Sequence, residues 1–291
     1  MEIIVDCHCH LDENMLPLEM MIRAMDKNGV GKTALMAKLC EPFYMKHNLK
    51  NRLMSSIFRK SLLGFNSLGK KIYDGFLDKK GNFLVLGETS AIVMRPDNAP
   101  LVEAVKKYPG RFWGWITINP EYRKEAAEEI EKYASVPEMI GVKVHPFFHK
   151  YDIEVMDWVA ALCSERKMPL LIHLSSQEEC YRYLPDKYPG LKVIYAHAGI
   201  PHFKKLWAYI KTKKNVYVDL SGGYLDAGLA EMAVRNVGYE KCLYGTDGPY
   251  GISHPGGDYD YSEMKDWVEG MKIPDGQKRD ILGNNFLSII S

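Results

Sequence analysis

The fold is decided by residues 140–174, which have the sequence IGVKVHPFFHKYDIEVMDWVAALCSERKMPLLIHL. Residues 140–145 and 170–174 are short apolar runs rich in β-forming side chains, a pattern typical of buried strands. Between them, residues 153–167 have a helical pattern that ends just before Pro169. Two strands joined through a helix are expected to lie parallel in one sheet.

The same alternation continues in both directions along the chain. We expect nine β-rich runs, at residues 3–7, 33–39, 83–87, 112–118, 140–145, 170–174, 192–197, 216–220 and 243–245, with further helical patterns at 121–134 and 202–214. Such alternation predicts a parallel sheet, and the number of units favours a closed barrel over a doubly wound sheet, because no GxGxxG follows the first run. The sequence therefore predicts an α/β fold, a (β/α)8 TIM barrel in one domain over residues 1–291, with residues 83–87 as the surplus run.

Residues 41–80 differ from the rest of the chain, since they hold nine Lys or Arg and three acidic residues. Met45, Leu49, Leu53, Ile57 and Phe58 form an apolar stripe at helical spacing. We expect a helical insertion after the second strand, serving as a cap over the barrel mouth or as an oligomer contact. Binding to a membrane surface and a plain solvated surface remain the alternatives for this segment.

Composition limits the partners. Of 291 residues, 46% are apolar and 26% charged, as in an ordinary globular protein, and 38 basic side chains against 37 acidic ones leave a net charge of +1. No global field exists to hold nucleic acid or a membrane, so we expect a small-molecule substrate, with a homo-oligomer left open. The start of the sequence lacks the pattern of a signal peptide, no apolar run could span a bilayer, and the six cysteines contain no CxxC pair. These features predict a cytoplasmic protein with reduced, buried cysteines.

The first strand ends in Asp6-Cys7-His8-Cys9-His10. Alternate side chains of a strand share a face, so we expect Asp6, His8 and His10 on one face and the two cysteines on the other. A structural zinc site made from Cys7 and Cys9 with a neighbouring histidine is the alternative, but it would need all its ligands on the same face.

Other candidate ligands come at the ends of later strands, namely His145, His173, His197 and Asp247. In a parallel α/β barrel the carboxyl ends of the strands meet in one bowl, where catalytic groups gather. Three or more imidazole nitrogens with a carboxylate form a ligand set for zinc or a similar divalent ion. The sequence thus predicts a metal site at the barrel mouth.

The ordered motifs VDCHCH, GVKVHP, PLLIHLSS, VIYAHAG, YGTDGP and ILGNNFLSII resemble those of the amidohydrolase superfamily. The resemblance is to the amidohydrolase-related group, amidohydrolase family 2, which includes aminocarboxymuconate-semialdehyde decarboxylase. It implies a (β/α)8 barrel with one divalent metal, zinc in the first place and manganese as the alternative. Residue by residue, it makes His8, His10, His173 and Asp247 the metal ligands and His197 the catalytic histidine.

These residues fit a hydrolase in which a metal-activated water attacks an amide, ester or lactone bond, with Asp247 or His197 as the proton acceptor. The alternative is a non-oxidative decarboxylase of an unsaturated or aromatic carboxylic acid, because the same groups can stabilise an electron-rich intermediate. A non-catalytic barrel is a third class, but every ligand-type residue is present.

Lys143, His145 and Tyr250 are candidate substrate-binding residues. Lys143 could alternatively become a carbamate bridging two metals, and an inward lysine paired with a barrel carboxylate is the structural alternative. Glu88 could be a further acidic group at a strand end, but a helix-capping or surface role is favoured. The loop after Asp247 could be a substrate lid or a loop packed by its own aromatic side chains, and it holds His254, Tyr259 and Tyr261. His47, His149 and His202 are expected to be structural or surface residues.

We predict that apoprotein titrated with Zn²⁺ or Mn²⁺ saturates near one equivalent per chain. Lys143 precedes the strand end marked by Pro146, which places it below the rim, so Lys143→Ala should leave the stoichiometry unchanged. The double variant His8→Ala, His10→Ala is the metal-free reference. The carbamate-bridged pair of metals would be favoured if the wild type binds two equivalents of metal, Lys143→Ala binds only one, and bicarbonate restores the second equivalent in the wild type alone.

Overall fold

The computed structural model describes residues 3–43, 49–85, 87–250 and 261–291. Eight of its strands form one sheet in the order β1-β2-β5-β6-β7-β8-β9-β10, and each neighbouring pair is parallel. The strands are β1 (Ile4–Leu11), β2 (Val30–Ala37), β5 (Phe112–Thr117), β6 (Met139–Val144), β7 (Leu170–Ile172), β8 (Val193–Tyr195), β9 (Val216–Asp219) and β10 (Cys242–Leu243).

Backbone hydrogen bonds connect the two ends of this sheet. The Cys7 amide donates to the Tyr244 carbonyl at 3.0 Å, and the Thr246 amide donates to the His8 carbonyl at 3.2 Å. A parallel bridge between Cys9 and Gly248 continues the contact. The sheet is therefore a nearly closed barrel, and the predicted (β/α)8 fold is confirmed.

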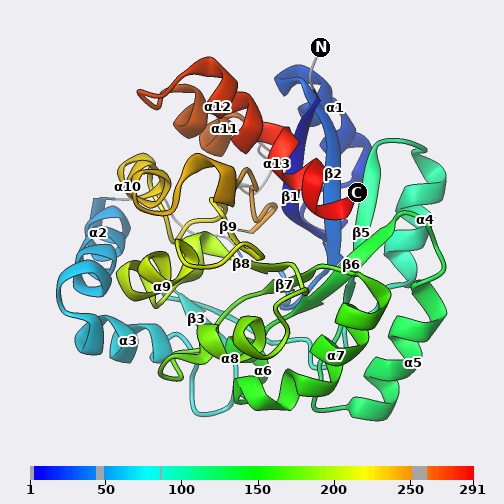
Figure 1. The fold of residues 1–291 in the computed structure, drawn as a ribbon, viewed down its shortest axis with the longest axis horizontal. Coiled ribbons are helices and arrows are strands. Elements are labelled where there is room, and N and C mark those ends of the chain that lie inside the picture. The colour runs from blue at the N-terminus through cyan, green and yellow to red at the C-terminus, as the bar shows by residue number, and fades with distance from the viewer. Residues whose placement is uncertain (1–2, 44–48, 86, 251–260) are drawn as a thin grey trace.

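Helices separate the strands and cover the outside of the barrel (Figure 1). They are α1 (Leu18–Asn28), α4 (Ala99–Lys107), α5 (Arg123–Tyr133), α6 (Pro146–His149), α7 (Asp157–Arg166), α8 (Cys180–Lys187), α9 (Phe203–Ile210), α10 (Ala227–Val237), α11 (Ser262–Glu269), α12 (Asp275–Arg279) and α13 (Asn285–Ile290). Their apolar faces and the outward strand residues form the larger core cluster, whereas the inward residues form a smaller one around Trp115.

The surplus run lies outside the barrel, as predicted. Strand β3 (Phe83–Val85) pairs antiparallel with β4 (Glu88–Ser90) in a separate two-stranded sheet. Between β2 and β3 the chain forms α2 (Leu49–Gly64) and α3 (Asn66–Asp74), which lie side by side at one edge of the molecule (Figure 1). The interpretation of 41–80 as an inserted cap stays a prediction, and Met45 falls outside the described residues.

Strand β1 does not alternate as expected. Three steps on β1, from Asp6 to Cys9, match two steps on β2, which is the signature of a β-bulge. Before the bulge, Cys7 packs in the barrel interior, and after it Cys9 packs in the outer cluster. The expectation that both cysteines share a face is therefore wrong, because the extra residue resets the alternation between them.

All six cysteines are free and buried, in agreement with the expectation of reduced thiols. Burial raises the pKa of the Cys7 and Cys9 thiols well above their ordinary value, and the two side chains pack in different core clusters, so the structure does not bring them together as a pair of metal ligands. Among the described residues, no helix is long and apolar enough to cross a membrane.

We predict that Gly141→Ala destabilises the barrel. A Cβ there would lie 2.5 Å from both the Pro169 carbonyl oxygen and the Trp115 ring, and backbone cannot move away cheaply. The free energy of unfolding should fall by about 1–3 kcal/mol in a denaturant titration. Gly190→Ala is the matched control, since nothing lies within 4 Å of its Cβ. Equal stability of the two variants would contradict the assigned packing of β6 and β7.

Candidate metal centre

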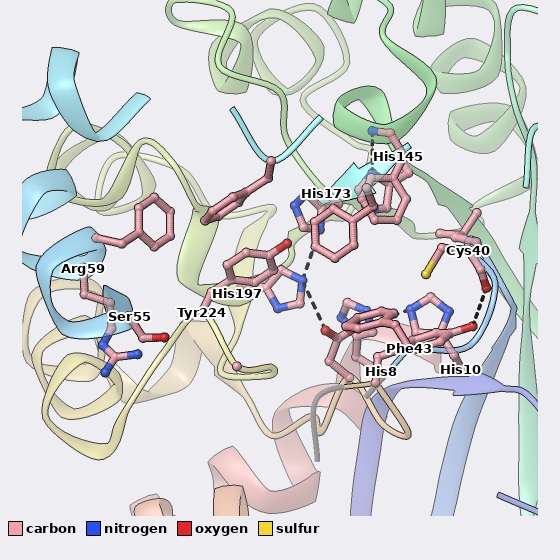
Figure 2. A pocket seen from close by; sticks show the side chains of 18 of the residues that line it. His8, His10, Cys40, Phe43, Ser55, Arg59, His145, His173, His197 and Tyr224 are labelled. Atoms are coloured by element: carbon pink, nitrogen blue, oxygen red, sulfur yellow. Dashed lines mark hydrogen bonds and ion pairs between the residues drawn. The ribbon is translucent and has the colours of Figure 1, made fainter. Parts of the chain in front are cut away.

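A cavity of about 170 Å³ lies at the carboxyl ends of the strands. Its base is polar and holds residues from five strand ends, namely His8, His10, Lys143, His145, His173, His197 and Asp247. Its walls are almost entirely apolar and aromatic, and α2 contributes Ser55 and Arg59 at the end away from His10 (Figure 2). The structure thus brings together every histidine and the aspartate that the sequence predicted at the barrel mouth.

Three of these histidines each use one ring nitrogen to hold a fixed partner. His8 Nδ1 donates to Asp219 Oδ2 at 2.8 Å, and His10 Nδ1 donates to the Ala37 carbonyl at 3.1 Å. His197 Nδ1 donates to the Ser221 carbonyl at 2.9 Å. Since a neutral imidazole carries one ring proton, each ring is left with a lone pair on Nε2.

His173 is oriented the other way round. The Tyr73 hydroxyl donates its proton to the Leu174 carbonyl at 2.7 Å, so it accepts a hydrogen bond from His173 Nε2 at 2.7 Å. The lone pair of His173 is therefore on Nδ1, which lies 3.1 Å from His197 Nε2. Two lone pairs at this distance repel each other, unless a positively charged group lies beside them.

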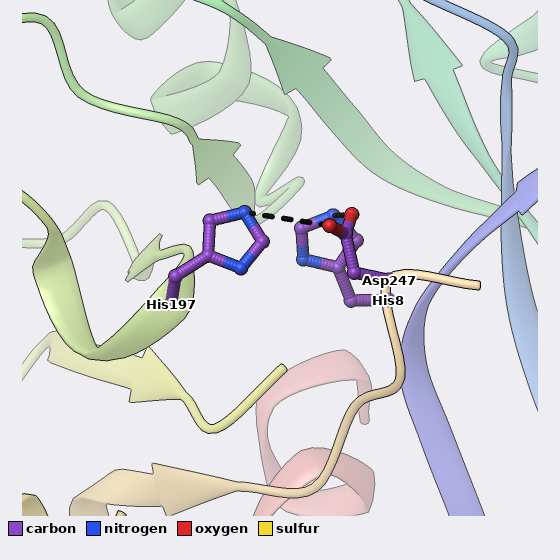
Figure 3. Close-up of side chains that lie close together, drawn as sticks. All are labelled: His8, His197 and Asp247. Carbon is purple, nitrogen blue, oxygen red and sulfur yellow. Dashed lines mark ion pairs between the residues drawn. The ribbon is translucent and has the colours of Figure 1, made fainter. Parts of the chain in front are cut away.

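Asp247 supplies a carboxylate to the same point. Its Oδ1 lies 3.1 Å from His8 Nε2 and 3.4 Å from His10 Nε2. Two ligands of a tetrahedral ion with bonds of 2.0–2.1 Å are about 3.3 Å apart, so these separations suit a shared metal. One ligand atom each from His8, His197 and Asp247 also lie within 4.8 Å of one another (Figure 3).

The electrostatics of the centre favour a cation. Burial lowers the pKa of His10, lowers that of His173 strongly, and lowers that of His197 to about 4, which keeps these rings neutral. Burial alone would raise the pKa of Asp247, but the neighbouring histidines hold it well below its ordinary value. Burial alone would lower the pKa of His8 as well, but Asp219 and Asp247 raise it above its ordinary value. With His8 also in its neutral form, the imidazoles and the carboxylate make a donor set that fits a divalent metal.

Lys143 is fully buried beneath the histidines, with its Nζ 3.5 Å from His8 Nε2. Burial lowers its pKa to about 8. In the described structure its ammonium group has no carboxylate in salt-bridge contact, so it adds a positive charge to the base of the cavity.

The loops that carry the site are held by buried contacts. Asp6 accepts hydrogen bonds from the backbone amide and hydroxyl of Thr246, the residue before Asp247. Gly222 lies so close to the site that a Cβ there would be 2.8 Å from His197 Nδ1 and 3.0 Å from Asp247 Oδ2. Its φ of +83° also favours glycine.

The remaining candidates separate into two groups. His145 accepts a hydrogen bond from the Phe148 amide through Nδ1 and stacks on His173 at 4.0 Å, so it presents an N–H, and not a lone pair, at Nε2. Tyr250 lines the cavity, but its hydroxyl donates to the Cys40 carbonyl. Glu88 lies in the β3–β4 hairpin, outside the cavity.

The histidines expected to be structural are so where they are described. His149 and His202 are buried and hydrogen bonded to the carbonyls of Val93 and Ser175. Tyr261 is buried against Thr33. His47, His254 and Tyr259 lie outside the described residues.

Sequence reasoning missed three residues of the site. Asp219 follows the β9 run and could have been found by the strand-end rule that found Asp247. Tyr73 on α3 and Tyr224 after β9 gave no such signal, because their approach to His173 and His197 depends on how α3 and the β9 loop pack.

The sequence model of one family, described as Amidohydrolase (Amidohydro_2), matches residues 85–285. Among curated proteins, none matches the chain in sequence.

Solved structures match over nearly their full length. They include a 5-carboxyvanillate decarboxylase from Sphingomonas paucimobilis, with 16% identity, coverage of 100% of this chain and 99% of that one, and a TM-score of 0.56. A dihydroxybenzoic acid decarboxylase from Polaromonas, with bound manganese and the inhibitor 2-nitroresorcinol, has 16% identity, coverage of 100% and 97%, and a TM-score of 0.55. A Pseudomonas putida protein named as a 2-pyrone-4,6-dicarboxylic acid hydrolase has 14% identity, coverage of 100% and 98%, and a TM-score of 0.61. At these identities the similarity shows the shared fold.

We predict that Tyr73→Phe weakens metal binding by about 10–100-fold, because the variant loses the group that fixes the His173 tautomer. Tyr224→Phe is the matched control, since Tyr224 also packs beside His173 and His197 but holds neither ring by a hydrogen bond. Competition with a chromogenic chelator measures both affinities. Equal affinities in the two variants would show that the Tyr73 hydroxyl does not orient the ligand.

Proposed function

Because the chain belongs to the amidohydrolase family and is an enzyme, we propose that it is a metal-dependent decarboxylase of a small aromatic or unsaturated carboxylic acid. The observation that carries the proposal is the convergence of histidine lone pairs and the Asp247 carboxylate at the base of a cavity with aromatic walls. Decarboxylases among the structures of similar fold support this choice of reaction.

In this proposal His8, His10, His173 and Asp247 hold the metal, with His197 beside it. When bound, the ion supplies a positive charge that draws electrons from the acidic end of the substrate. Nitrogen and oxygen ligands suit both Zn²⁺ and Mn²⁺, and the manganese in the Polaromonas enzyme supports testing both.

The residues of the chain do the rest of the chemistry. Lys143 and the His145 Nε2 proton attract the carboxylate to the base of the cavity. The bond between the substrate carbon and its carboxyl group breaks, carbon dioxide leaves, and the electron pair stays on the substrate carbon. That carbon takes a proton in place of carbon dioxide. His197 takes up this proton from solvent at Nε2, where its lone pair lies, and passes it to the carbon, while its Nδ1 stays hydrogen bonded to the Ser221 carbonyl.

The cavity walls favour a flat, apolar substrate body. Phe43, Phe76, Phe83, Phe148 and Tyr224 line the cavity beside the histidines. Aromatic rings stack favourably on such walls, which also exclude water from the reacting carbon.

Hydrolysis of an amide, ester or lactone is the second candidate. The contact that favours it is the approach of the Asp247 carboxylate to His8 and His197, which gives water a proton acceptor at the metal site. The Pseudomonas putida protein named as a hydrolase has a similar fold.

We predict that the protein, loaded with Zn²⁺ or Mn²⁺, releases carbon dioxide from at least one acid in a panel of hydroxybenzoic, benzoic and unsaturated carboxylic acids. Lactones and amides are assayed in parallel as substrates for hydrolysis. His197→Asn should bind metal normally and lose about 10²–10⁴-fold in turnover, since it removes only the proton donor. His173→Asn, in contrast, should bind metal more weakly than the wild type, since it removes a proposed ligand. Lactone or amide cleavage without carbon dioxide release would favour the hydrolase, and metal loss in His197→Asn alone would exchange the roles of the two histidines.

A further inference from the structure

The most exposed large apolar side chains are concentrated on α2 and α3. Within the described ranges, the six highest exposures belong to Leu49 (83%), Phe65 (72%), Leu53 (59%), Ile57 (54%), Leu68 (52%) and Met54 (46%). Elsewhere in these ranges no large apolar side chain exceeds 38%. Such concentrated exposure is typical of a contact surface.

This exposure has a helical pattern. Leu49, Leu53 and Ile57 follow one another at four-residue intervals, so they share the outer face of α2. Phe58 and Leu62 are buried on its inner face, where Phe58 lines the cavity. The apolar stripe seen in the sequence is therefore divided, and its larger part is not used in packing the described fold.

The same helices carry unpaired positive charge. Lys50, Arg52, Lys60 and Lys71 form no ion pair with the described part of the chain, and all four are exposed. Arg59 and Lys70 do have partners, Asp226 and Glu178. The single acidic residue between 49 and 74 is Asp74.

We propose that the outer face of α2 and α3, defined by Leu49, Leu53, Ile57, Phe65 and Leu68 with their flanking cations, docks on an anionic lipid surface. Amphipathic helices bind such surfaces by burying an apolar face at the headgroup boundary, while Lys and Arg attract the anionic lipids. The net charge of +1 gives the whole protein no such attraction, so the contact depends on this local face.

A second copy of the chain fits this face less well. In a two-fold dimer the same patch meets itself, which would bring the four unpaired cations of one copy toward those of the other. An anionic bilayer neutralises these charges and covers the apolar side chains at once. It would also lie beside the wall of the cavity, since α2 and α3 supply Met54, Phe58 and Ile72 to that wall.

Flotation of the full-length protein with lipid vesicles tests the proposal. We expect binding to vesicles of phosphatidylcholine mixed with phosphatidylglycerol in equal parts, weaker binding to phosphatidylcholine alone, and loss of binding at high salt. Lys50→Gln with Lys60→Gln should weaken partitioning by about tenfold or more. Leu53→Ser with Ile57→Ser should also weaken it, by about tenfold.

Matched controls separate this face from general charge and stability. Lys27→Gln with Lys106→Gln removes two exposed lysines on α1 and α4, and Met232→Ser removes an exposed apolar side chain on α10. These controls should bind vesicles like the wild type, and thermal unfolding should show that every variant is folded. Wild-type protein that ignores anionic vesicles, or equal loss in the control pair, would overturn the proposal. The face would instead belong to a contact with a second copy if the wild type does not bind vesicles and is a dimer in light scattering, and if Leu53→Ser with Ile57→Ser dissociates that dimer.

Discussion

The carboxylate of Asp219 is the interaction on which the centre depends. It accepts hydrogen bonds from the His8 ring, from the His197 amide and from the amide and hydroxyl of Ser221, and so joins the ends of β1, β8 and β9. Burial alone would raise its pKa, but the neighbouring His8, His197 and Ser221 hold that pKa below its ordinary value. One buried anion therefore orients the His8 ring, fixes the backbone at His197 and holds three strand ends together.

The β1 bulge is the second constraint on the centre. Without the extra residue, Cys7 inside the barrel would require His8 to face the outer helices. With the extra residue, β1 packs Cys7 in the barrel interior and also directs both His8 and His10 into the cavity at the barrel mouth. The fold thus uses a local irregularity to combine a packed interior with a polar base of the cavity, as bulges near active sites commonly do.

The cavity combines this polar base with apolar walls taken from segments far apart in the sequence. Helices α2 and α3 and the β3–β4 hairpin provide much of the wall, whereas the strands provide the histidines. Such a division lets the barrel keep its chemistry while the surrounding segments determine which molecule fits. The outer face of the same helices remains exposed, so these two helices present one surface to the cavity and another to the surroundings.

The sequence by itself determined the parallel barrel, the run outside it, and the meeting of His8, His10, His145, His173, His197 and Asp247, because periodicity and strand ends are local properties of the chain. Tertiary structure alone decided the rest. The bulge in β1 follows from its register with β2, and the tautomer of His173 follows from Tyr73, a hundred residues away on α3. Register and long-range hydrogen bonds depend on how elements pack, so the side chains that orient the histidines of the site could not be found from local pattern.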